Sequence, residues 1–167
     1  DVIDGDEDAD VLVGDDGDDI LIGGSGNDQI ADGNGSDRVD GESGDDVLIA
    51  SADSANDFFG GGEGIDRLDY SNSIVNLTFV LSENYVTGDA LGQDQFASIE
   101  VLVGGQTADR FVVNENSITL DGGAGNDTFE IVSPTTHNSE AIVLEQEFQH
   151  FVGGQGIDAL DYSNVES

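Results

Sequence analysis

Several residue types are scarce or missing in this chain of 167 residues, and each absence excludes a class of protein. There is no cysteine, which excludes disulfide bridges and thiolate metal sites. There is no lysine, and three arginines stand against 37 acidic residues, so the formal net charge is −34. Binding to nucleic acid or to an anionic membrane surface needs basic residues. We therefore expect neither as a partner.

Long apolar runs are missing as well. No apolar run approaches the roughly 18 residues that a membrane-spanning helix needs, so no membrane span is expected. No secretory signal peptide opens the chain, and we expect the chain to be an excised piece of a longer protein. Proline occurs once and glycine 24 times, which is typical of tight repeated turns rather than of a proline-rich linker.

The charge and the apolar content together constrain folding. A chain with a net charge of −34 repels itself, so it either stays disordered or is neutralised by a cation when it folds. The hydrophobic fraction is 37%, and Val, Ile, Leu and Phe recur in a fixed register. This regularity favours folding with a cation.

A nine-residue repeat, G-G-x-G-x-D-x-U-x with U a large apolar residue, organises much of the chain. Its aspartates are spaced nine apart from Asp10 to Asp46, eleven apart to Asp57 and nine apart again to Asp66. An apolar residue follows each aspartate two positions later: Leu12, Leu21, Ile30, Val39, Leu48, Phe59 and Leu68. Further copies occupy residues 104–112, 122–130 and 153–161.

Two of the copies lie within a longer repeated phrase. Residues 61–72 read GGEGIDRLDYSN, and residues 153–164 read GGQGIDALDYSN. The segment EFQHFVGGQ (147–155), which leads into the second phrase, parallels SIEVLVGGQ (98–106), so each spacer leads into a glycine turn. The phrase therefore marks the same junction in a module of longer period.

The residue types of the repeat suit a hard cation. Glycine permits positive φ and close backbone approach, so that neighbouring carbonyls can point inward. Calcium takes six to eight oxygens, at about 2.3–2.6 Å, from carboxylates and carbonyls. One aspartate per turn is too few, so two stacked turns have to share an ion. The last three residues, x-U-x, predict a short strand with U buried.

The unit resembles the RTX, or hemolysin-type, calcium-binding nonapeptide repeat. The resemblance implies an all-β fold: a right-handed parallel β-roll, or β-solenoid, with consecutive units on opposite sides and several calcium ions between stacked glycine-rich turns. The implied aspartate ligands are Asp10, Asp19, Asp28, Asp37, Asp46, Asp57, Asp66, Asp109, Asp127 and Asp158. The implied glycine ligands are Gly14, Gly17, Gly23, Gly24, Gly26, Gly33, Gly35, Gly41, Gly44, Gly61, Gly62, Gly64, Gly122, Gly123 and Gly125.

The resemblance also implies which aspartates share an ion. The expected pairs are Asp10–Asp28, Asp28–Asp46 and Asp46–Asp66 on one edge, Asp19–Asp37 and Asp37–Asp57 on the other, and Asp109–Asp127. Nine residues before and after Asp109 stand Glu100 and Ile118. We therefore expect metal on both edges of the first block and on one edge only of the later block.

The expected organisation is a row of blocks. These are an RTX roll with calcium on both edges (1–69), a β spacer that continues the solenoid (70–103), a second short RTX block (104–130), a second spacer (131–152) and the start of a further module (153–167). Alternating apolar residues over 75–81 and 99–103 predict strands in the first spacer.

The resemblance implies a function outside the cell. It implies a calcium-binding structural or adhesive region of a protein that is secreted by a type I system or held at the bacterial surface, and that folds on calcium after export. The long-period spacers resemble those of large secreted bacterial adhesins, whose partners would be cell-surface or carbohydrate ligands. The piece itself is expected to be a monomer.

Three alternatives stay open. The chain could be the calcium-binding secretion tail of an RTX toxin, protease or lipase. It could be a calcium-dependent polysaccharide lyase or epimerase on a β-helix, although such an enzyme needs a basic catalytic residue that scattered arginines do not supply. It could also present Tyr70, Tyr85 or Tyr162 to sugars or ice.

No catalytic residue is expected. His137 and His150 do not stand in a metal-ligand spacing, and Ser71 and Ser163 have no histidine in a local motif. We therefore expect the chain not to be an enzyme.

Overall fold

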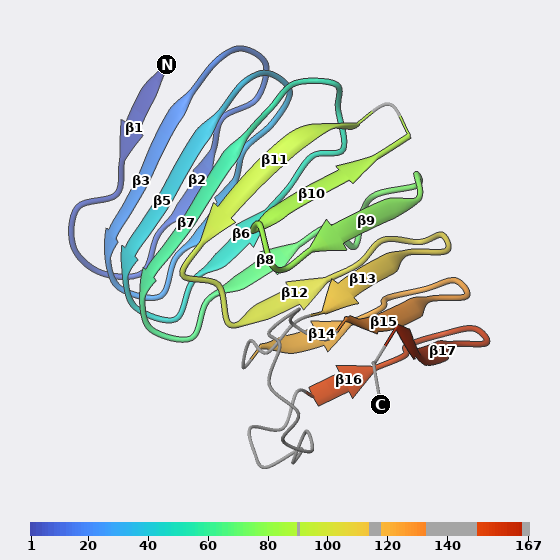
Figure 1. Cartoon of the computed structure of the whole chain (residues 1–167). Helices are drawn as coiled ribbons and strands as arrows, with labels where there is room; N and C mark the ends of the chain where they lie inside the picture. The colour runs from blue at the N-terminus through green and yellow to red at the C-terminus, as the bar shows by residue number, and fades with distance from the viewer. Residues whose placement is uncertain (90, 114–117, 133–149, 165–167) are drawn as a thin grey trace.

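Two stacked β-sheets form the protein, in a computed structural model that describes residues 1–89, 91–113, 118–132 and 150–164 (Figure 1). Sheet A has the strand order β1 (Val2–Asp4), β3 (Ile20–Ser25), β5 (Arg38–Ser43), β7 (Phe58–Glu63), β11 (Leu91–Ala97), β10 (Tyr85–Gly88), β9 (Leu77–Val80), β13 (Arg110–Val113), β15 (Thr128–Val132), β17 (Ala159–Asn164). Sheet B has the order β16 (His150–Val152), β14 (Thr119–Asp121), β12 (Val101–Val103), β8 (Arg67–Asp69), β6 (Val47–Ile49), β4 (Gln29–Ala31), β2 (Val11–Val13). Within the described ranges there is no helix, and so none long and apolar enough to cross a membrane.

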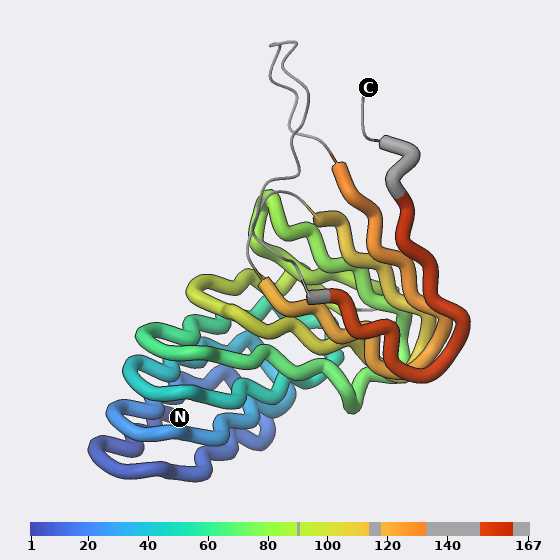
Figure 2. Tube along the Cα trace, turned by 90° about the horizontal axis from the view of Figure 1, so that it is seen from below, coloured from blue at the N-terminus to red at the C-terminus, as the bar shows by residue number. Residues whose placement is uncertain are grey.

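The chain alternates between the two sheets, and each coil lies against the previous one. In sheet B, Leu12 is level with Ile30, Ile30 with Leu48, and Leu48 with Leu68, all in parallel pairs. Sheet A repeats the arrangement from β1 through β7. Figure 2 shows these coils stacked along the molecule. The predicted parallel β-roll is therefore confirmed.

The apolar position of each repeat forms the core. The seven residues predicted to point inward, from Leu12 to Leu68, are each 0–4% exposed. An aromatic row continues this core, with rings of Phe79 and Phe111 stacked at 4.4 Å and Phe111 and Phe129 at 4.9 Å. Burial of such side chains is the main favourable term in folding, at about 1.5–3 kcal/mol each.

The first spacer adds three strands to sheet A and one to sheet B. From β8 the chain passes to β9, which lies beside β13, and then returns toward β7 through β10 and β11. Strand β10 is antiparallel to both of its neighbours, which a purely parallel roll does not contain. Between β8 and β14, sheet B gains β12 alone. Most of the predicted second spacer, residues 133–149, lies outside the described residues, as do residues 165–167.

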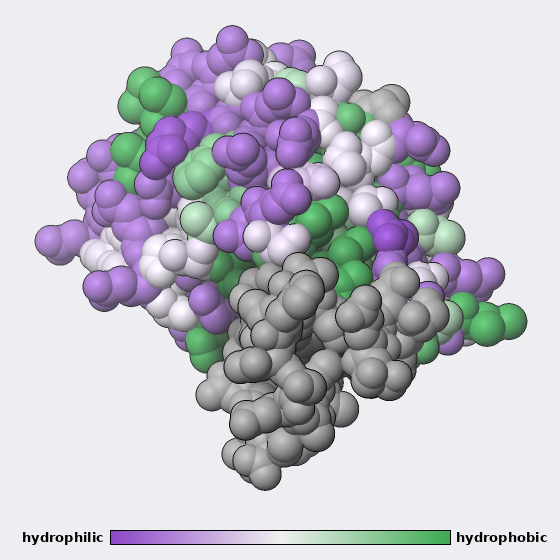
Figure 3. Space-filling view, viewed as in Figure 1, coloured by the Kyte–Doolittle hydropathy of each residue, from purple (hydrophilic) through white to green (hydrophobic). Residues whose placement is uncertain are grey.

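The outer surface is strongly acidic. Figure 3 shows hydrophilic residues over most of the visible face of the N-terminal coils, with hydrophobic residues in small separated groups. The three arginines pair with carboxylates at this surface: Arg38 with Asp40, Arg67 with Asp69 and Arg110 with Glu130. Their side chains are 37–53% exposed, so the arginines are surface charges.

Candidate metal centres

The repeat aspartates of sheet B form one continuous row, which we call the B row. Each stands directly before a strand, and its Oδ1 accepts the backbone N–H of the aspartate in the preceding coil. These bonds run from Asp10 N–H to Asp28 at 2.8 Å, from Asp28 to Asp46 at 2.8 Å and from Asp46 to Asp66 at 2.9 Å. The row ends on Glu100, whose Oε2 accepts the N–H of Asp66 at 2.9 Å.

Sheet A carries an equivalent row, the A row. Asp37 Oδ1 accepts the N–H of Asp19 at 2.8 Å, and Asp57 Oδ1 accepts that of Asp37 at 2.7 Å. The row ends on Asp94, whose Oδ1 accepts the N–H of Asp57 at 3.1 Å. Both rows follow the neighbour order that the resemblance implies as far as Asp66 and Asp57.

A shorter row follows the first spacer. Asp109 accepts the N–H of Leu77, Asp127 accepts that of Asp109, and Asp158 accepts that of Asp127. Ile118 occupies the corresponding place on sheet B and has no carboxylate. A carboxylate row on one edge only is what the sequence predicts for this block.

The second carboxylate oxygen of most row members has no partner. Oδ2 is buried and makes no hydrogen bond in Asp10, Asp19, Asp28, Asp37, Asp46, Asp66 and Asp127. A buried charged oxygen without a partner is strongly unfavourable. Buried charges in proteins are normally paired or coordinate a metal. The repetition of the same orphaned atom in coil after coil therefore points to a cation.

The first glycine of each turn leaves space beside this oxygen. A Cβ atom added at Gly23 would lie 2.4 Å from Asp28 Oδ2 and 2.8 Å from the carbonyl oxygen of Gly41 in the next coil. At Gly41 the corresponding distances, to Asp46 Oδ2 and the carbonyl of Gly61, are 2.3 and 2.6 Å. Any side chain would fill the space between the carboxylate and the carbonyl of the adjacent coil.

The fourth position of the turn stacks carbonyls in the same way. A Cβ at Gly44 would lie 1.6 Å from the carbonyl oxygen of Gly26, and one at Gly64 would lie 2.0 Å from that of Gly44. These glycines have φ values of +136° and +144°, which L side chains rarely adopt. Backbone oxygens are thereby directed from one turn to the next.

Burial also weakens the acidity of these carboxyls. It raises the pKa of Asp46 and of Asp109 to about 6 and that of Asp57 to about 7, with neighbouring carboxylates adding to the effect. Asp32, which replaces the first glycine of its repeat, is fully buried, and burial raises its pKa to about 8. A divalent ion would offset the cost of ionising such groups.

Side chains alone do not build a site. Among the described residues, no three His, Asp or Glu side chains come together in a way that could hold a metal ion. A bound ion would therefore take one or two carboxylates and complete its shell with turn carbonyls. This donor set, all oxygen and flexible in number, fits calcium.

Three of the aspartates predicted as ligands, Asp57, Asp109 and Asp158, lack a buried Oδ2 without a hydrogen-bond partner. Asp109 has both oxygens occupied, because Gly105 N–H donates to its Oδ2 at 2.6 Å. The orphaned oxygen of this block belongs to Asp127, beside the turn that ends in Asp158, and Asp158 itself is exposed. In the A row, Asp57 is buried but its Oδ2 is not among the orphaned oxygens.

Asp94 and Glu100 are row members that the sequence does not identify as ligands, although a count of nine back from Asp109 reaches Glu100. Both lie outside any glycine turn. Both still match the last part of the repeat, in which an acidic residue is followed two positions later by a buried apolar residue, here Phe96 and Leu102. A search for that shorter pattern finds them.

Tyr70 is a core residue and not a surface ligand group. It is fully buried between Phe59 and Phe79, and its hydroxyl donates to Asp94 Oδ2 at 2.7 Å. The interpretation of Tyr70 as an exposed contact for sugars or ice is therefore wrong, because its ring fills the interior at the end of the A row. The side chain of Tyr162 lies outside the described residues.

Parallel coils with oxygen-lined glycine turns define a calcium-binding β-roll. A comparison with protein-family models finds the RTX calcium-binding nonapeptide repeat in four copies, at residues 1–30, 22–54, 32–68 and 103–130. These cover more than half of the chain, which belongs to this family. The repeats of the family bind several calcium ions and are structural rather than catalytic. No curated protein matches the chain.

Proposed function

We propose that this chain is a calcium-folded structural region of a secreted bacterial protein and that it has no catalytic activity of its own. Calcium ions bind between successive turns of the B row and of the A row, and between the turns that end in Asp127 and Asp158. The observation that carries this proposal is the buried Oδ2 without a partner, repeated in seven aspartates.

Calcium binding and folding form a single process in this proposal. Without a cation, the net charge of −34 and the buried carboxylates oppose stacking of the coils. Each calcium ion adds two positive charges, links two turns and allows the apolar row from Leu12 to Leu68 to be buried. The free energy of binding then appears as free energy of folding.

Secretion follows from the same coupling. Proteins that carry these repeats are typically exported by type I systems, and extracellular calcium modules bind with dissociation constants of about 10⁻⁴–10⁻³ M. Such sites stay empty at cytosolic calcium levels and fill outside the cell. The chain passes the export channel unfolded and folds after release.

Within the parent protein, an adhesin-type array fits better than a secretion tail. The repeated phrase at 61–72 and 153–164 marks a module of longer period, and the spacer 70–103 adds its own strands to sheet A. In this organisation the roll of 1–69, the short block of 104–130 and the module that begins at 153 are rigid units of an extended array. A plain secretion tail needs no such spacers.

A calcium titration of chelator-stripped protein tests the proposal, with far-UV circular dichroism and small-angle scattering as measurements. We expect a cooperative gain of β signal with calcium, and a fall of the radius of gyration from about 43 Å toward the value of about 15 Å for a compact chain of this length. Magnesium is the control, because it demands a smaller, octahedral shell and keeps its waters. A complete β spectrum in chelator would contradict calcium-driven folding.

The Asp28→Ala variant tests the rows themselves. Asp28 lies between two other aspartates of the B row, so its removal is expected to abolish two calcium sites. The number of bound ions is measured by native mass spectrometry, and Glu63→Ala is the control, because Glu63 is an exposed acid at the third position of a turn. An unchanged ion count in folded Asp28→Ala would contradict the shared-carboxylate arrangement.

A further inference from the structure

The B row does not end with the last nonapeptide of its block. Strand β12 pairs with β8 so that Leu102 is level with Leu68, which places Glu100 where a further repeat aspartate would stand. Glu100 Oε2 accepts the N–H of Asp66 at 2.9 Å, as Asp66 does for Asp46. The carboxylate row therefore continues for one coil into the spacer, where no glycine turn exists.

The backbone supplies the second part of a turn at the same place. A Cβ added at Gly61 would lie 2.5 Å from Asp66 Oδ2 and 2.0 Å from the carbonyl oxygen of Ser98. In the coil before, the same two places are taken by Asp46 Oδ2 and the carbonyl of Gly61. Ser98 thus substitutes for the first glycine of a turn, and its φ of +52° belongs to the bend that brings its carbonyl there.

One atom at this place lacks a partner. Asp66 is fully buried, and its Oδ2 is among the orphaned oxygens. The A row ends in another way, because the last carboxylate of that row, Asp94, has both oxygens occupied, by the Asp57 N–H and by the Tyr70 hydroxyl. Tyr70 thus donates to the last carboxylate of the A row, whereas in the B row Asp66 Oδ2, beside the terminal Glu100, has no donor.

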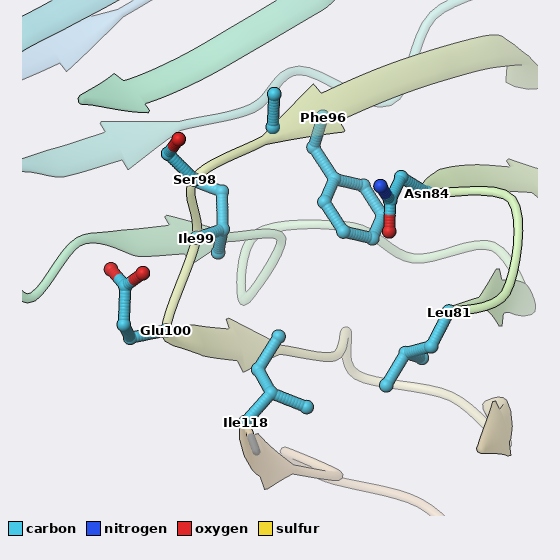
Figure 4. Close-up of a pocket in the computed structure, with 8 residues that line it drawn as sticks. Leu81, Asn84, Phe96, Ser98, Ile99, Glu100 and Ile118 are labelled. Carbon is cyan, nitrogen blue, oxygen red and sulfur yellow. The ribbon is translucent and has the colours of Figure 1, made fainter. Parts of the chain in front are cut away.

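A pocket borders the bend 98–100. Its volume is about 250 Å³, and it is lined by Ser98 and Glu100 on one side and by Leu81, Phe96 and Ile118 on the other (Figure 4). In Figure 4, the polar ends of Ser98 and Glu100 point to the same side of the bend, away from Phe96 and Leu81.

We propose that Glu100 closes an additional divalent-cation site, of calcium type, between the turn 61–66 and the bend 98–100. Its protein ligands are Asp66 Oδ2, the Glu100 carboxylate and the carbonyl oxygens of Ser98 and of the turn 61–66. This site rests on the proposed function, because it assumes that calcium binds between coils as in the preceding turns.

The site differs from those in the repeats in the number of its backbone ligands. In a repeat, a full glycine turn separates the residue with the first carbonyl from the aspartate, as Gly61 is separated from Asp66. In the bend, the corresponding residues are Ser98 and Glu100, which stand only two positions apart. The bend therefore lacks the carbonyls of the middle turn positions, and water molecules take their places in the shell of the proposed ion. Calcium affinity depends on the number and charge of the ligands, so this site fills last in a titration.

Glu100→Gln is the test, with bound calcium counted by native mass spectrometry along a titration of the whole chain. We expect one ion fewer than in the wild type at intermediate calcium, with the affinity of the last step weakened by at least the roughly 10–100-fold that outer-shell changes cause. Glu100→Asp, which restores the repeat residue, keeps the full count. Glu83→Gln is the matched control for the lost charge, because Glu83 is exposed in the turn between β9 and β10.

The outcomes separate the two proposals. An unchanged count in Glu100→Gln, with Asp28→Ala still losing ions, overturns the Glu100 site and leaves the proposed function standing. No calcium bound by the wild type overturns the proposed function. If Glu100→Gln fails to fold, crystals of the wild type grown in calcium decide the question by anomalous scattering. A peak between Asp66 and Glu100 supports the site, and peaks in the glycine turns alone overturn it.

Discussion

At the scale of single residues, the first glycine of each turn is required by the atoms around it. At Gly23, the space of a Cβ atom is limited by Asp28 Oδ2 at 2.4 Å and by the Gly41 carbonyl at 2.8 Å. These are the two oxygens that calcium would share. A methyl group there competes with the ion as well as with the packing of the coils.

We therefore expect Gly23→Ala to lose one calcium ion and to lower the stability of the calcium-bound protein by about 1–3 kcal/mol, as overpacking does. The measurement combines an ion count with chemical denaturation in excess calcium. Gly60→Ala is the control, since Gly60 is buried in β7 but its added Cβ would meet nothing closer than Phe58 at 3.4 Å. Equal effects of the two substitutions would show that the turn space has no role in binding.

The residues that could be predicted from the sequence are those whose neighbours are determined by the nine-residue repeat. With one unit per sheet, each repeat aspartate is stacked on the aspartate of the next coil, and the apolar residue two positions later is buried. Glu100 and Asp94 follow Asp66 and Asp57 at intervals of 34 and 37 residues, so a count forward from the first block does not reach them. A count of nine back from Asp109 reaches Glu100 but does not show that it lies beside Asp66. Counting by nine does not cross a spacer, since the number of residues in it is not set by the coil.

At the scale of elements, the spacer is where sequence and structure differ most. Alternation of apolar residues correctly predicts strands at 77–80 and 101–103, but it carries no information on strand direction. The antiparallel strand β10 arises because the chain first reaches the far side of the gap, beside β13, and has to return to β7. Direction is decided by these long-range pairings.

The elements also differ in what stabilises them. Strands β2 to β8 lie beside two rows of carboxylates, whose charge is neutralised by calcium in the proposed function. Strands β9 and β13 enclose the stacked rings of Phe79 and Phe111, and Leu77 takes the place of a carboxylate at the start of β9. Apolar packing does not require a cation, so the two regions should respond differently to chelation.

Hydrogen exchange measures this difference. On stepwise removal of calcium, we expect the amides of β2 to β8 to lose protection first, and those of β9, β10 and β13 to lose it at lower calcium. Exchange is followed by mass spectrometry at several free calcium concentrations, with magnesium as control. Simultaneous loss along the whole chain would show a single cooperative unit and contradict separate stabilisation.

At the scale of the whole molecule, several carboxyls that are buried in the fold also have raised pKa values, and Asp46 and Asp57 are among the proposed calcium ligands. Burial raises the pKa of Asp46 to about 6, of Asp57 to about 7 and of Asp32 to about 8, from an ordinary value of 3.8. Between about pH 4 and pH 8, the folded chain therefore holds more protons on these carboxyls than the unfolded chain does. The resulting stability is fully present below about pH 4 and is lost as the pH rises through 6 to 8.

In chelator, we therefore expect the melting temperature to rise as the pH is lowered from 8 to 5, because protonation removes the buried charge that calcium otherwise compensates. In the presence of calcium, protons and calcium both stabilise the folded state, so the calcium concentration at the folding midpoint should decrease over the same pH range, while competition weakens the calcium affinity of the folded protein. Both are measured by circular dichroism in buffers of equal ionic strength, which keeps the screening of surface charge constant. A melting temperature in chelator that falls on acidification would show that the buried carboxylates are not what opposes folding. The charge that requires calcium would then lie on the outer surface.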